Sequence, residues 1–543
     1  MDRVLETVVK ITPMANWTSD WTRIAVAAAV IYVLSRIAKY YSGLQAVGYL
    51  PGKRCAYPPL SFLDMISPWG KGLRYLWNTR FHDFYAEYGT DTISVVPWFA
   101  STPQIHSADM EVLRQLMSGG VKSPWFKFRS PVMEEWGHSL FTVEREEWQK
   151  HRKILAPAFS SEMYAYVWDQ AVRAYHDMIA HEGWADQDTV EITVLQRLTS
   201  KLAFLLLAVC GFGLDASWSD PTTTSTGGMT VPHALRIFVM PSIAVLLPKW
   251  MRWIPLKQVR DFCHARGLLD QYMRTQVNER RKLVKSQIEL NEEGSRDIFS
   301  VLVRANELNA RSVDTQKLTL SDGEVISNVF LMLFAGHETS AETLAATFAL
   351  LAVHQDVQEV VYQQIIDVVG TGRDPTPGEY HQLDKVLNAF YEASRMFPAS
   401  FSAARVAAED STLVVPNAHG SGREGRIIVR KGVLVVGDTL GIEYNPRYYP
   451  EPEKFLPSRW EGDDKTDLVS SFGVGQRTCI GRRFATTEAV AFLTMWLRDW
   501  KVEPLLKPGE SVDEWTERIV DARFFLTLGI QDVPVRMKRR AQV

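Results

Sequence analysis

Residues 472–481 read FGVGQRTCIG, and this short stretch decides how the rest of the chain is interpreted. Three glycines surround a single cysteine, Cys479, and a mostly apolar run at 485–496 follows. The apolar run predicts a helix, so Cys479 is expected near a helix start, where the helix dipole favours a thiolate. Glycines allow the backbone to approach a flat group closely, because no side chain intervenes.

The other cysteines differ from Cys479 in their surroundings. The chain contains four cysteines in 543 residues, without a CxxC pair, which excludes a dense disulfide scaffold and indicates reduced thiols facing the cytosol. Cys210 ends the apolar run 205–210 and is interpreted as a small buried hydrophobe. A glycine-rich turn that merely contains a buried cysteine remains the alternative for Cys479, since most lone cysteines are of that kind.

Composition and periodicity favour one large, mainly α domain with small β-sheets. Hydrophobic residues make up 46% of the chain, and the net charge of -3 argues against a nucleic-acid partner. The longest helical pattern runs over 321–354, where Ser321 and Glu324 form a capping box. Short runs of β-type residues occur at 92–96, 412–415 and 426–429.

The N-terminal segment has the features of a membrane anchor. Residues 24–34 are apolar and uncharged, and a helix over 21–41 would have aromatic residues at both membrane interfaces. A cleaved signal peptide is the alternative interpretation. The sequon at Asn16 is placed where a lumenal tail could carry a glycan. We therefore expect residues 1–45 to form a tail and membrane anchor helix, and residues 46–543 to form the catalytic domain.

The cysteine loop matches the pattern F-x-x-G-x-R-x-C-x-G at Phe472, Gly475, Arg477, Cys479 and Gly481. This pattern resembles the haem-binding loop of the cytochrome P450 superfamily. The resemblance implies a haem b cofactor whose iron has the Cys479 thiolate as its axial ligand, an arrangement that favours O–O cleavage. It also implies that Arg477 pairs with a haem propionate and that Phe472 shields the sulfur.

Two further matches concern a structural cluster. Glu392 and Arg395 resemble the E-x-x-R pair of the family, and their i, i+3 spacing places both side chains on one helix face. The segment 455–460 (FLPSRW) is similar to the PERF-type segment, although Ser458 stands where the family usually has glutamate. By this resemblance, Arg459 completes a buried Glu-Arg-Arg cluster that braces the cofactor-binding core.

Other matches concern side chains that would hold the cofactor. Trp148 and Arg152 resemble the W-x-x-x-R motif, whose side chains lie one turn apart and face one propionate. Arg405, ten residues after Arg395, resembles a second arginine that binds a propionate. A small residue is often found three positions before the tryptophan in the family, and this chain has Arg145 there instead.

The middle of the long helix carries the residues for oxygen chemistry. Residues 335–339 read AGHET and resemble the motif A-G-x-D/E-T over the distal face of the haem. The resemblance implies that Ala335 and Gly336 lie against the cofactor, that Gly336 leaves room for dioxygen, that Thr339 hydrogen-bonds the activated oxygen and that Glu338 relays protons. The structural alternative is that the Thr339 hydroxyl donates a hydrogen bond to the carbonyl four residues earlier and that Glu338 faces water.

The resemblance is closest to microsomal, fungal-type monooxygenases. Such an enzyme takes electrons from NADPH through a separate reductase and inserts one oxygen atom into an apolar small molecule. It is a single-pass protein of the endoplasmic reticulum membrane whose catalytic domain faces the cytosol. Basic residues on the proximal side would meet the reductase, and 235–256 would dip into the membrane. Those basic residues are Lys150, Lys153, Arg482 and Arg483.

Several functions remain open at this point. A terpenoid-like substrate of secondary metabolism is favoured by analogy with the family. Hydroxylation of fatty acids or foreign compounds is an alternative. A haem-thiolate isomerase or dehydratase would need no reductase, but such enzymes typically lose the acid–threonine pair that is present here as Glu338 and Thr339. A non-catalytic haem- or lipid-binding protein would need no proton relay.

Overall fold

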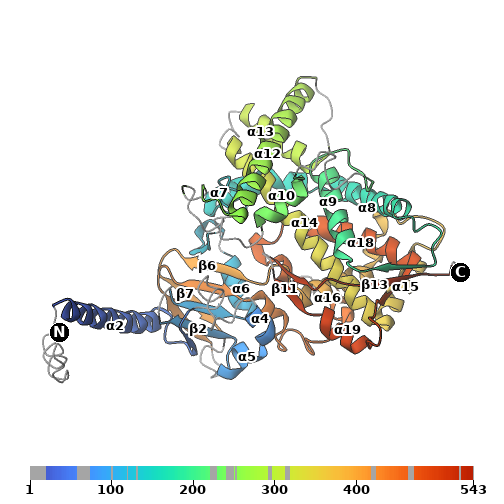
Figure 1. Cartoon of the computed structure of the whole chain (residues 1–543). Coiled ribbons are helices and arrows are strands. Elements are labelled where there is room, and N and C mark those ends of the chain that lie inside the picture. The colour runs from blue at the N-terminus through green and yellow to red at the C-terminus, as the bar shows by residue number, and fades with distance from the viewer. Residues whose placement is uncertain are drawn as a thin grey trace.

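Helices dominate the fold, as the periodicity predicts, in a computed structural model of the chain (Figure 1). The structure describes residues 20–57, 74–98, 102–118, 120–129, 133–219, 229–239, 250, 253–290, 296–311, 318–416, 424–462, 470–524 and 527–541. Asn16 and the rest of the tail before α2, residues 1–19, lie outside these ranges. The α-helices are α2 (Asp20–Ala46), α4 (Arg74–Thr79), α5 (His82–Tyr85), α6 (Met110–Met117), α7 (Arg145–Leu155), α8 (Ser161–His181), α9 (Gln196–Leu206), α10 (Val231–Val239), α12 (Lys257–Glu289), α13 (Ile298–Arg311), α14 (Asp322–Val353), α15 (Gln355–Val368), α16 (Asp384–Met396), α17 (Thr439–Glu443), α18 (Arg482–Asp499) and α19 (Val512–Ile519).

The strands form small sheets, of which the one that contains β2 and β6 lies at the end next to α2 and the one that contains β13 lies beside α15 (Figure 1). The largest has the order β1-β2-β3-β9-β6-β4, and β10-β13-β5 form another. The strands expected at 92–96, 412–415 and 426–429 are present as β2, β7 and β8, so the predicted fold class is confirmed. The strands are β1 (Gly52–Cys55), β2 (Thr92–Pro97), β3 (Gln104–Ser107), β4 (Trp125–Lys127), β5 (Thr189–Ile192), β6 (Ala403–Ala407), β7 (Ser411–Val415), β8 (Gly425–Val429), β9 (Leu434–Gly437), β10 (Trp500–Pro504), β11 (Ala522–Phe524), β12 (Leu528–Ile530) and β13 (Val535–Arg539).

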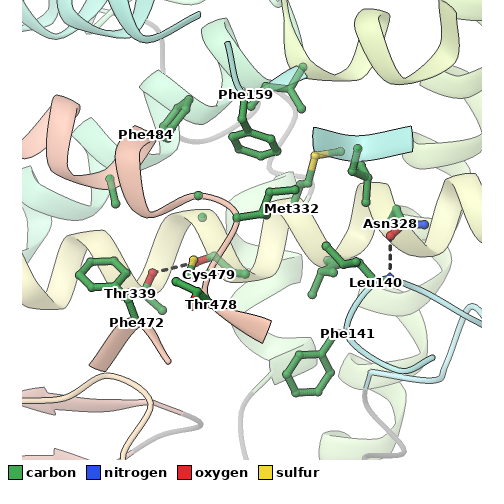
Figure 2. A pocket seen from close by; sticks show the side chains of 18 of the residues that line it. Leu140, Phe141, Phe159, Asn328, Met332, Thr339, Phe472, Thr478, Cys479 and Phe484 are labelled. Atoms are coloured by element: carbon green, nitrogen blue, oxygen red, sulfur yellow. Dashed lines mark hydrogen bonds between the residues drawn. The ribbon is translucent and has the colours of Figure 1, made fainter. Parts of the chain in front are cut away.

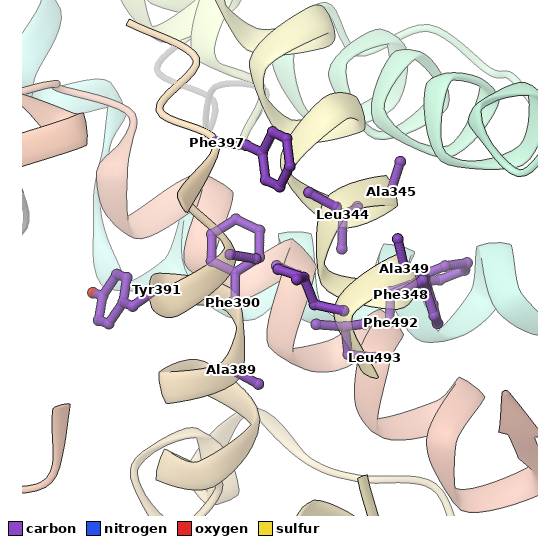
Figure 3. Close-up of a cluster of buried hydrophobic side chains, with 14 of the residues drawn as sticks. Leu344, Ala345, Phe348, Ala349, Ala389, Phe390, Tyr391, Phe397, Phe492 and Leu493 are labelled. Atoms are coloured by element: carbon purple, nitrogen blue, oxygen red, sulfur yellow. The ribbon is translucent and has the colours of Figure 1, made fainter. Parts of the chain in front are cut away.

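The long helix α14 is fixed at its start by local chemistry and along its second half by packing. Ser321 caps it, and the reciprocal bonds between Ser321 and Glu324 form the expected capping box. Farther along, Leu344 and Phe348 pack in a buried cluster with Phe390 of α16 and Phe492 of α18 (Figure 3). Each such side chain contributes about 1.5–3 kcal/mol by leaving water. These contacts hold α14, α16 and α18 at fixed relative positions.

Helix α2 projects from the sheet end of the molecule (Figure 1). Its segment Arg23–Ala46 is long and apolar enough to cross a membrane, with a mean hydropathy of 1.4 and none of the window buried in the protein. The helix extends past the expected end at residue 41, because Tyr40 and Leu44 pack against the cluster that contains Val96. The last turns of α2 are thereby joined to the sheet.

The structure brings Glu392, Arg395 and Arg459 together, as the resemblance implies. Arg395 donates two hydrogen bonds to the Glu392 carboxylate, at 2.9 and 3.0 Å, and both side chains are fully buried. Arg459 Nε lies 2.9 Å from the same carboxylate, and Trp460 Nε1 lies 2.8 Å from its second oxygen. The cluster ties α16 to the segment that leads to the cysteine loop. Its charges must stay paired, because a lone charge at a buried position would be costly.

Replacing Glu392 by alanine should destabilise the protein by about 3–5 kcal/mol, because two buried guanidinium groups lose their counter-charge. The shift in the urea unfolding midpoint measures this effect. The control is Glu191→Ala, which removes one partner of the exposed pair between Arg536 and Glu191, 2.8 Å apart, and should cost less than about 1 kcal/mol. Equal midpoint shifts for the two variants would contradict a bracing role for Glu392.

Candidate active site

A cavity lies between α14 and the cysteine loop that precedes α18 (Figure 2). Apolar side chains such as Leu140, Phe141, Phe159 and Met332 form most of its wall. Most residues expected to act in binding or catalysis line it as well. These are Trp148, Arg152, Ala335, Gly336, Thr339, Phe472, Arg477, Cys479 and Gly481. Gly475, Arg405 and Glu338 are not among the lining residues.

The cysteine loop is closed by its own backbone. The amide of Cys479 donates to the carbonyl of Phe472 at 2.8 Å, and the amide of Thr478 donates to the carbonyl of Gly475 at 3.2 Å. Gly475 has φ +66°, a conformation that favours glycine, and a Cβ there would lie 3.5 Å from the Met117 carbonyl. Gly475 thus shapes the loop from outside the cavity, and the loop turns the Cys479 side chain toward the cavity.

The Cys479 side chain is accessible through the cavity that it lines, although protein atoms surround the sulfur closely. Burial raises the pKa of the thiol, and the backbone N–H groups of Gly481 and Arg482 at the start of α18 oppose this by donating to the sulfur. The positive charges of Arg152 and Arg482 act in the same direction as these N–H groups. The site therefore has dipoles directed at the sulfur, and a bound metal cation would hold the thiolate form.

Buried positive charge gathers beside the cavity. Burial lowers the pKa of Lys127, and it lowers the pKa of Arg405 to about 10, while their charges and that of Arg477 repel one another. The carboxylate of Glu144 pairs with Arg477 and partly compensates the three cations. Arg405 bonds the Met117 sulfur at 2.8 Å instead of reaching the cavity wall. This excess of buried cations fits an anionic ligand group, because unpaired buried charge is costly.

Trp148 and Arg152 lie one turn apart on α7 and both line the cavity. The Arg477 guanidinium lies over the Trp148 ring, 4.4 Å from its centroid, and Arg152 Nη1 donates to the Thr478 carbonyl at 3.3 Å. The unexpected Arg145 has φ +51°, in the left-handed region. The preference of the family for a small residue there has a physical reason, since glycine adopts this conformation without strain.

Only some residues of the AGHET motif (335–339) in α14 line the cavity. Thr339 lines the cavity, and its hydroxyl donates to the Ala335 carbonyl at 2.8 Å, the local bond typical of threonine in helices. Gly336 also lines it, and a Cβ there would lie 3.2 Å from Leu207 Cδ1, so the glycine lets the π-helix Leu207–Gly211 approach closely. Glu338 is half-buried and accepts a hydrogen bond from Thr527 Oγ1 at 2.9 Å.

Two buried carboxyl groups near this motif were not identified from the sequence. Burial raises the pKa of Glu342 to about 7, and the nearby charge of Glu338, one turn earlier, acts in the same direction. Burial raises the pKa of Glu488 on α18 to about 8, the nearby Ser340 side chain acts in the opposite direction, and both carboxylate oxygens of Glu488 are buried without a hydrogen-bond partner among the described residues. The i, i+4 spacing of Glu338 and Glu342 in an apolar helix was the available signal for the first. The second depends on tertiary packing.

Comparison with known proteins identifies the family. A family model for cytochrome P450 matches residues 77–520. Cytochrome P450 monooxygenase 124 from Postia placenta is 32% identical over 523 residues, which cover 95% of this chain and 98% of that protein. Cyclooctat-9-en-7-ol 5-monooxygenase from Streptomyces melanosporofaciens is 27% identical over 388 residues, 69% of this chain and 74% of that protein. The chain belongs to the cytochrome P450 family.

A solved structure agrees on the fold. The cytochrome P450DA heme domain superposes with a TM-score of 0.68 at 19% identity, over 91% of this chain and 99% of that one. The family model and the Postia placenta relative, not this superposition, show that the chain is a monooxygenase with haem b as its cofactor, as expected from the sequence. The site fits that group, because it presents one thiol to an apolar cavity and a cluster of buried cations to the acidic edge of a porphyrin.

The stability of the protein should depend on the protonation of Glu488. Its raised pKa means that the neutral form is favoured in the folded state, so its contribution is complete below about pH 4.5 and is lost as the pH rises toward 8. The variant Glu488→Gln stays neutral. Its melting temperature relative to the parent should therefore rise by a few degrees between pH 5 and pH 8.5.

The matched control is Glu517→Gln, which changes an exposed carboxylate on α19. Its melting temperature should follow that of the parent at every pH. An identical pH dependence for Glu488→Gln and the parent would show that Glu488 is ionised in the folded protein at all these pH values.

Proposed function

We propose that the chain is a membrane-anchored monooxygenase in which Cys479 is the axial ligand of the haem iron. The observation that carries this proposal is the Cys479 sulfur, which faces the cavity with two backbone N–H groups donating to it. When bound, the haem supplies activation of dioxygen and transfer of one oxygen atom. Electron-rich thiolate ligation favours that chemistry, whereas an imidazole ligand would favour oxygen carriage or peroxide use.

The basic cluster would hold the two acidic side chains of the porphyrin. Arg477 and Arg152 line the cavity directly, with Lys127 beside them. Arg405 lies behind Arg477, where its charge adds to the field without contact with the cavity. Phe472 lines the same wall and would keep water from the Cys479 sulfur. Charge-assisted bonds of this kind orient a carboxylate strongly.

Proton delivery is assigned to α14. The Thr339 hydroxyl donates its own proton to the Ala335 carbonyl, so its lone pairs are free to accept from a group in the cavity. Glu338 precedes Thr339 on α14, is half-buried, does not line the cavity and accepts a hydrogen bond from Thr527. We assign to Glu338 the transfer of protons from the outside and to Thr339 the retention of the proton at the reacting oxygen.

Electrons would come from NADPH through a separate reductase. Lys153 is exposed on α7 and is suited to an acidic partner surface. Lys150, expected in the same role, instead pairs with Glu324 at 2.9 Å and is less available for docking. Arg482 and Arg483 at the start of α18 are half-buried, with Arg483 stacked 3.4 Å over the Tyr380 ring. Fewer of the four expected basic residues are therefore available for reductase docking than the sequence predicted.

The substrate is proposed to be an apolar small molecule of secondary metabolism, with terpenoids favoured. Apolar side chains form most of the cavity wall, including Leu207, Leu331 and Met332. One relative is named for its action on cyclooctat-9-en-7-ol, an unsaturated alcohol. Fatty acids and foreign compounds are the competing substrate classes. The discriminating observation is the metabolite profile of a host that expresses the chain together with a reductase.

The anchor would place the enzyme on the endoplasmic reticulum membrane in single-pass topology, with the catalytic domain in the cytosol. The exposed apolar segment Ile24–Leu34 of α2 supports this proposal. Trp250 and Trp253 are also exposed and suit a second membrane contact within 235–256, although much of that segment lies outside the described residues. Glycosylation at Asn16 remains part of the proposal.

Replacing Cys479 by alanine should abolish the red-shifted Soret band that carbon monoxide gives with thiolate-ligated ferrous haem. The controls are Cys210→Ala and Cys263→Ala, which remove thiols that do not line the cavity. Both controls should keep the band. The assignment fails if the Cys479 variant keeps it.

Replacing Thr339 by alanine should leave haem binding intact while product formed per NADPH falls several-fold and hydrogen peroxide rises. Thr343→Ala is the matched control, because Thr343 makes the same local bond, to the Thr339 carbonyl at 2.9 Å, outside the cavity lining. Glu338→Gln should instead slow NADPH consumption itself. Tight coupling in Thr339→Ala would mean that this hydroxyl is only structural.

Deleting residues 1–34 should release the protein from membranes that are washed with carbonate, because it removes the exposed apolar part of α2. The carbon monoxide spectrum should persist, since these residues do not line the cavity. A full-length variant with leucine at every position of 24–34 should stay in the pellet. Retention of the truncated chain after carbonate washing would refute the proposal that α2 is the membrane anchor.

A further inference from the structure

A second, more polar cavity lies where the end of α2 meets the sheet, away from the haem site. One wall is formed by α2, and the others are formed by β2, by residues 102–103 and by the β8–β9 connection at 430–433. Its lining contains four cationic side chains and no acidic one in the described part of the chain. The cations are Arg36, Lys39, Arg430 and Lys431.

The cations are poorly compensated. The carboxylate of Asp410, outside the lining, accepts from Arg430 Nη1 at 2.6 Å and from the Lys431 amide at 2.8 Å. Arg36, Lys39 and Lys431 have no ion-pair partner among the described residues, and Arg36 Nε is buried without a hydrogen-bond acceptor. Four clustered cations in a chain of net charge -3 define a local anion site.

The cavity walls are held in place by close packing. A Cβ at Gly43 would lie 3.1 Å from Val96 Cγ1, so the glycine lets α2 lie against β2 with little space between them. Val47 and Leu50, just after the helix, are fully buried in the cluster that contains Val96. The four cations therefore keep their relative positions when the domain moves, as a specific site requires.

Aromatic side chains lie on the same part of α2 as the cavity cations Arg36 and Lys39. Tyr40 stacks on Trp98 with ring centroids 4.1 Å apart and planes at 1°, and Tyr41 is exposed beside it. Tyrosine and tryptophan gather where a membrane meets water, and Arg36 and Lys39 are the first cations after the apolar segment. If α2 spans the membrane as proposed above, the cavity therefore lies at the depth of the lipid headgroups.

We propose that this cavity binds the phosphate group of an anionic phospholipid from the leaflet in which α2 ends. The inference rests on the membrane anchoring proposed above. The lipid would join α2 and the β8–β9 connection through one shared anion, with its acyl chains along the apolar face of α2. A phosphate fixed in this way would set the tilt of the catalytic domain on the membrane.

The test uses the full-length, haem-loaded protein in nanodiscs of phosphatidylcholine with or without phosphatidic acid. Native mass spectrometry should find one phosphatidic acid retained per chain after release from the nanodisc. The double variant Arg36→Gln with Lys431→Gln should retain it on the order of twenty-fold less well, since each cation near the surface counts about five-fold. Lys282→Gln with Lys507→Gln, which removes two exposed charges far from the cavity, should retain it like the parent.

Two further arms separate the possible outcomes. Inorganic phosphate should compete with the lipid only at millimolar concentration, and phosphate binding without lipid retention would overturn the lipid assignment. Equal retention of phosphatidic acid by the parent and by the double variant Arg36→Gln with Lys431→Gln would show that the cavity is not the binding site. Carbonate washing tests the anchor separately. If the parent is extracted, the anchoring proposal fails, and binding of short-chain phosphatidic acid in solution then decides whether the cavity recognises the phosphate.

Discussion

Negative charge on a cysteine sulfur that is surrounded by protein is unfavourable. The rest of this structure is arranged around that constraint. Cys479 lies where the cysteine loop turns into α18, and the first N–H groups of the helix donate to its sulfur. Burial still dominates and keeps the pKa of the thiol raised. The thiolate therefore depends on a bound cation, which links formation of the ligand to binding of the haem.

The scaffold holds this sulfur opposite α14. Glu392 joins Arg395 of α16 to Arg459, in the segment before the cysteine loop, and apolar packing joins α14, α16 and α18. The two walls of the cavity are therefore parts of one rigid body. A shift in either wall would change the distance between Thr339 and the Cys479 sulfur, and positioning errors of about 1 Å are costly in catalysis.

The sequence predicts features that depend on local spacing. The capping box at Ser321, the helix that follows it and the loop around Cys479 all follow from contacts within a few residues. The pairing of Glu392 with Arg395 is of the same kind, but Arg459 came from the family resemblance alone. The conformation at position 145 could not be predicted, because an arginine there gives no sign of the positive φ that its backbone adopts.

The sequence did not predict features that depend on contacts between residues far apart in the chain. Lys127 and Glu144 complete the basic cluster, yet they come from β4 and from the residue before α7, and spacing does not show that these meet Arg477. The Glu488 carboxyl group comes near Ser340 only because α18 packs on α14. The cationic cavity is the extreme case, because Arg36 and Lys431 are distant in the chain and meet through the sheet.

The most direct test of the central claim is X-ray absorption at the iron edge of the full-length, haem-loaded protein. The account predicts one sulfur atom in the first coordination shell of the resting enzyme. In Cys479→Ser that sulfur should be replaced by a lighter atom, with the four nitrogen neighbours of the porphyrin retained. A sulfur neighbour that persists in Cys479→Ser, or a parent enzyme without one, would contradict the account.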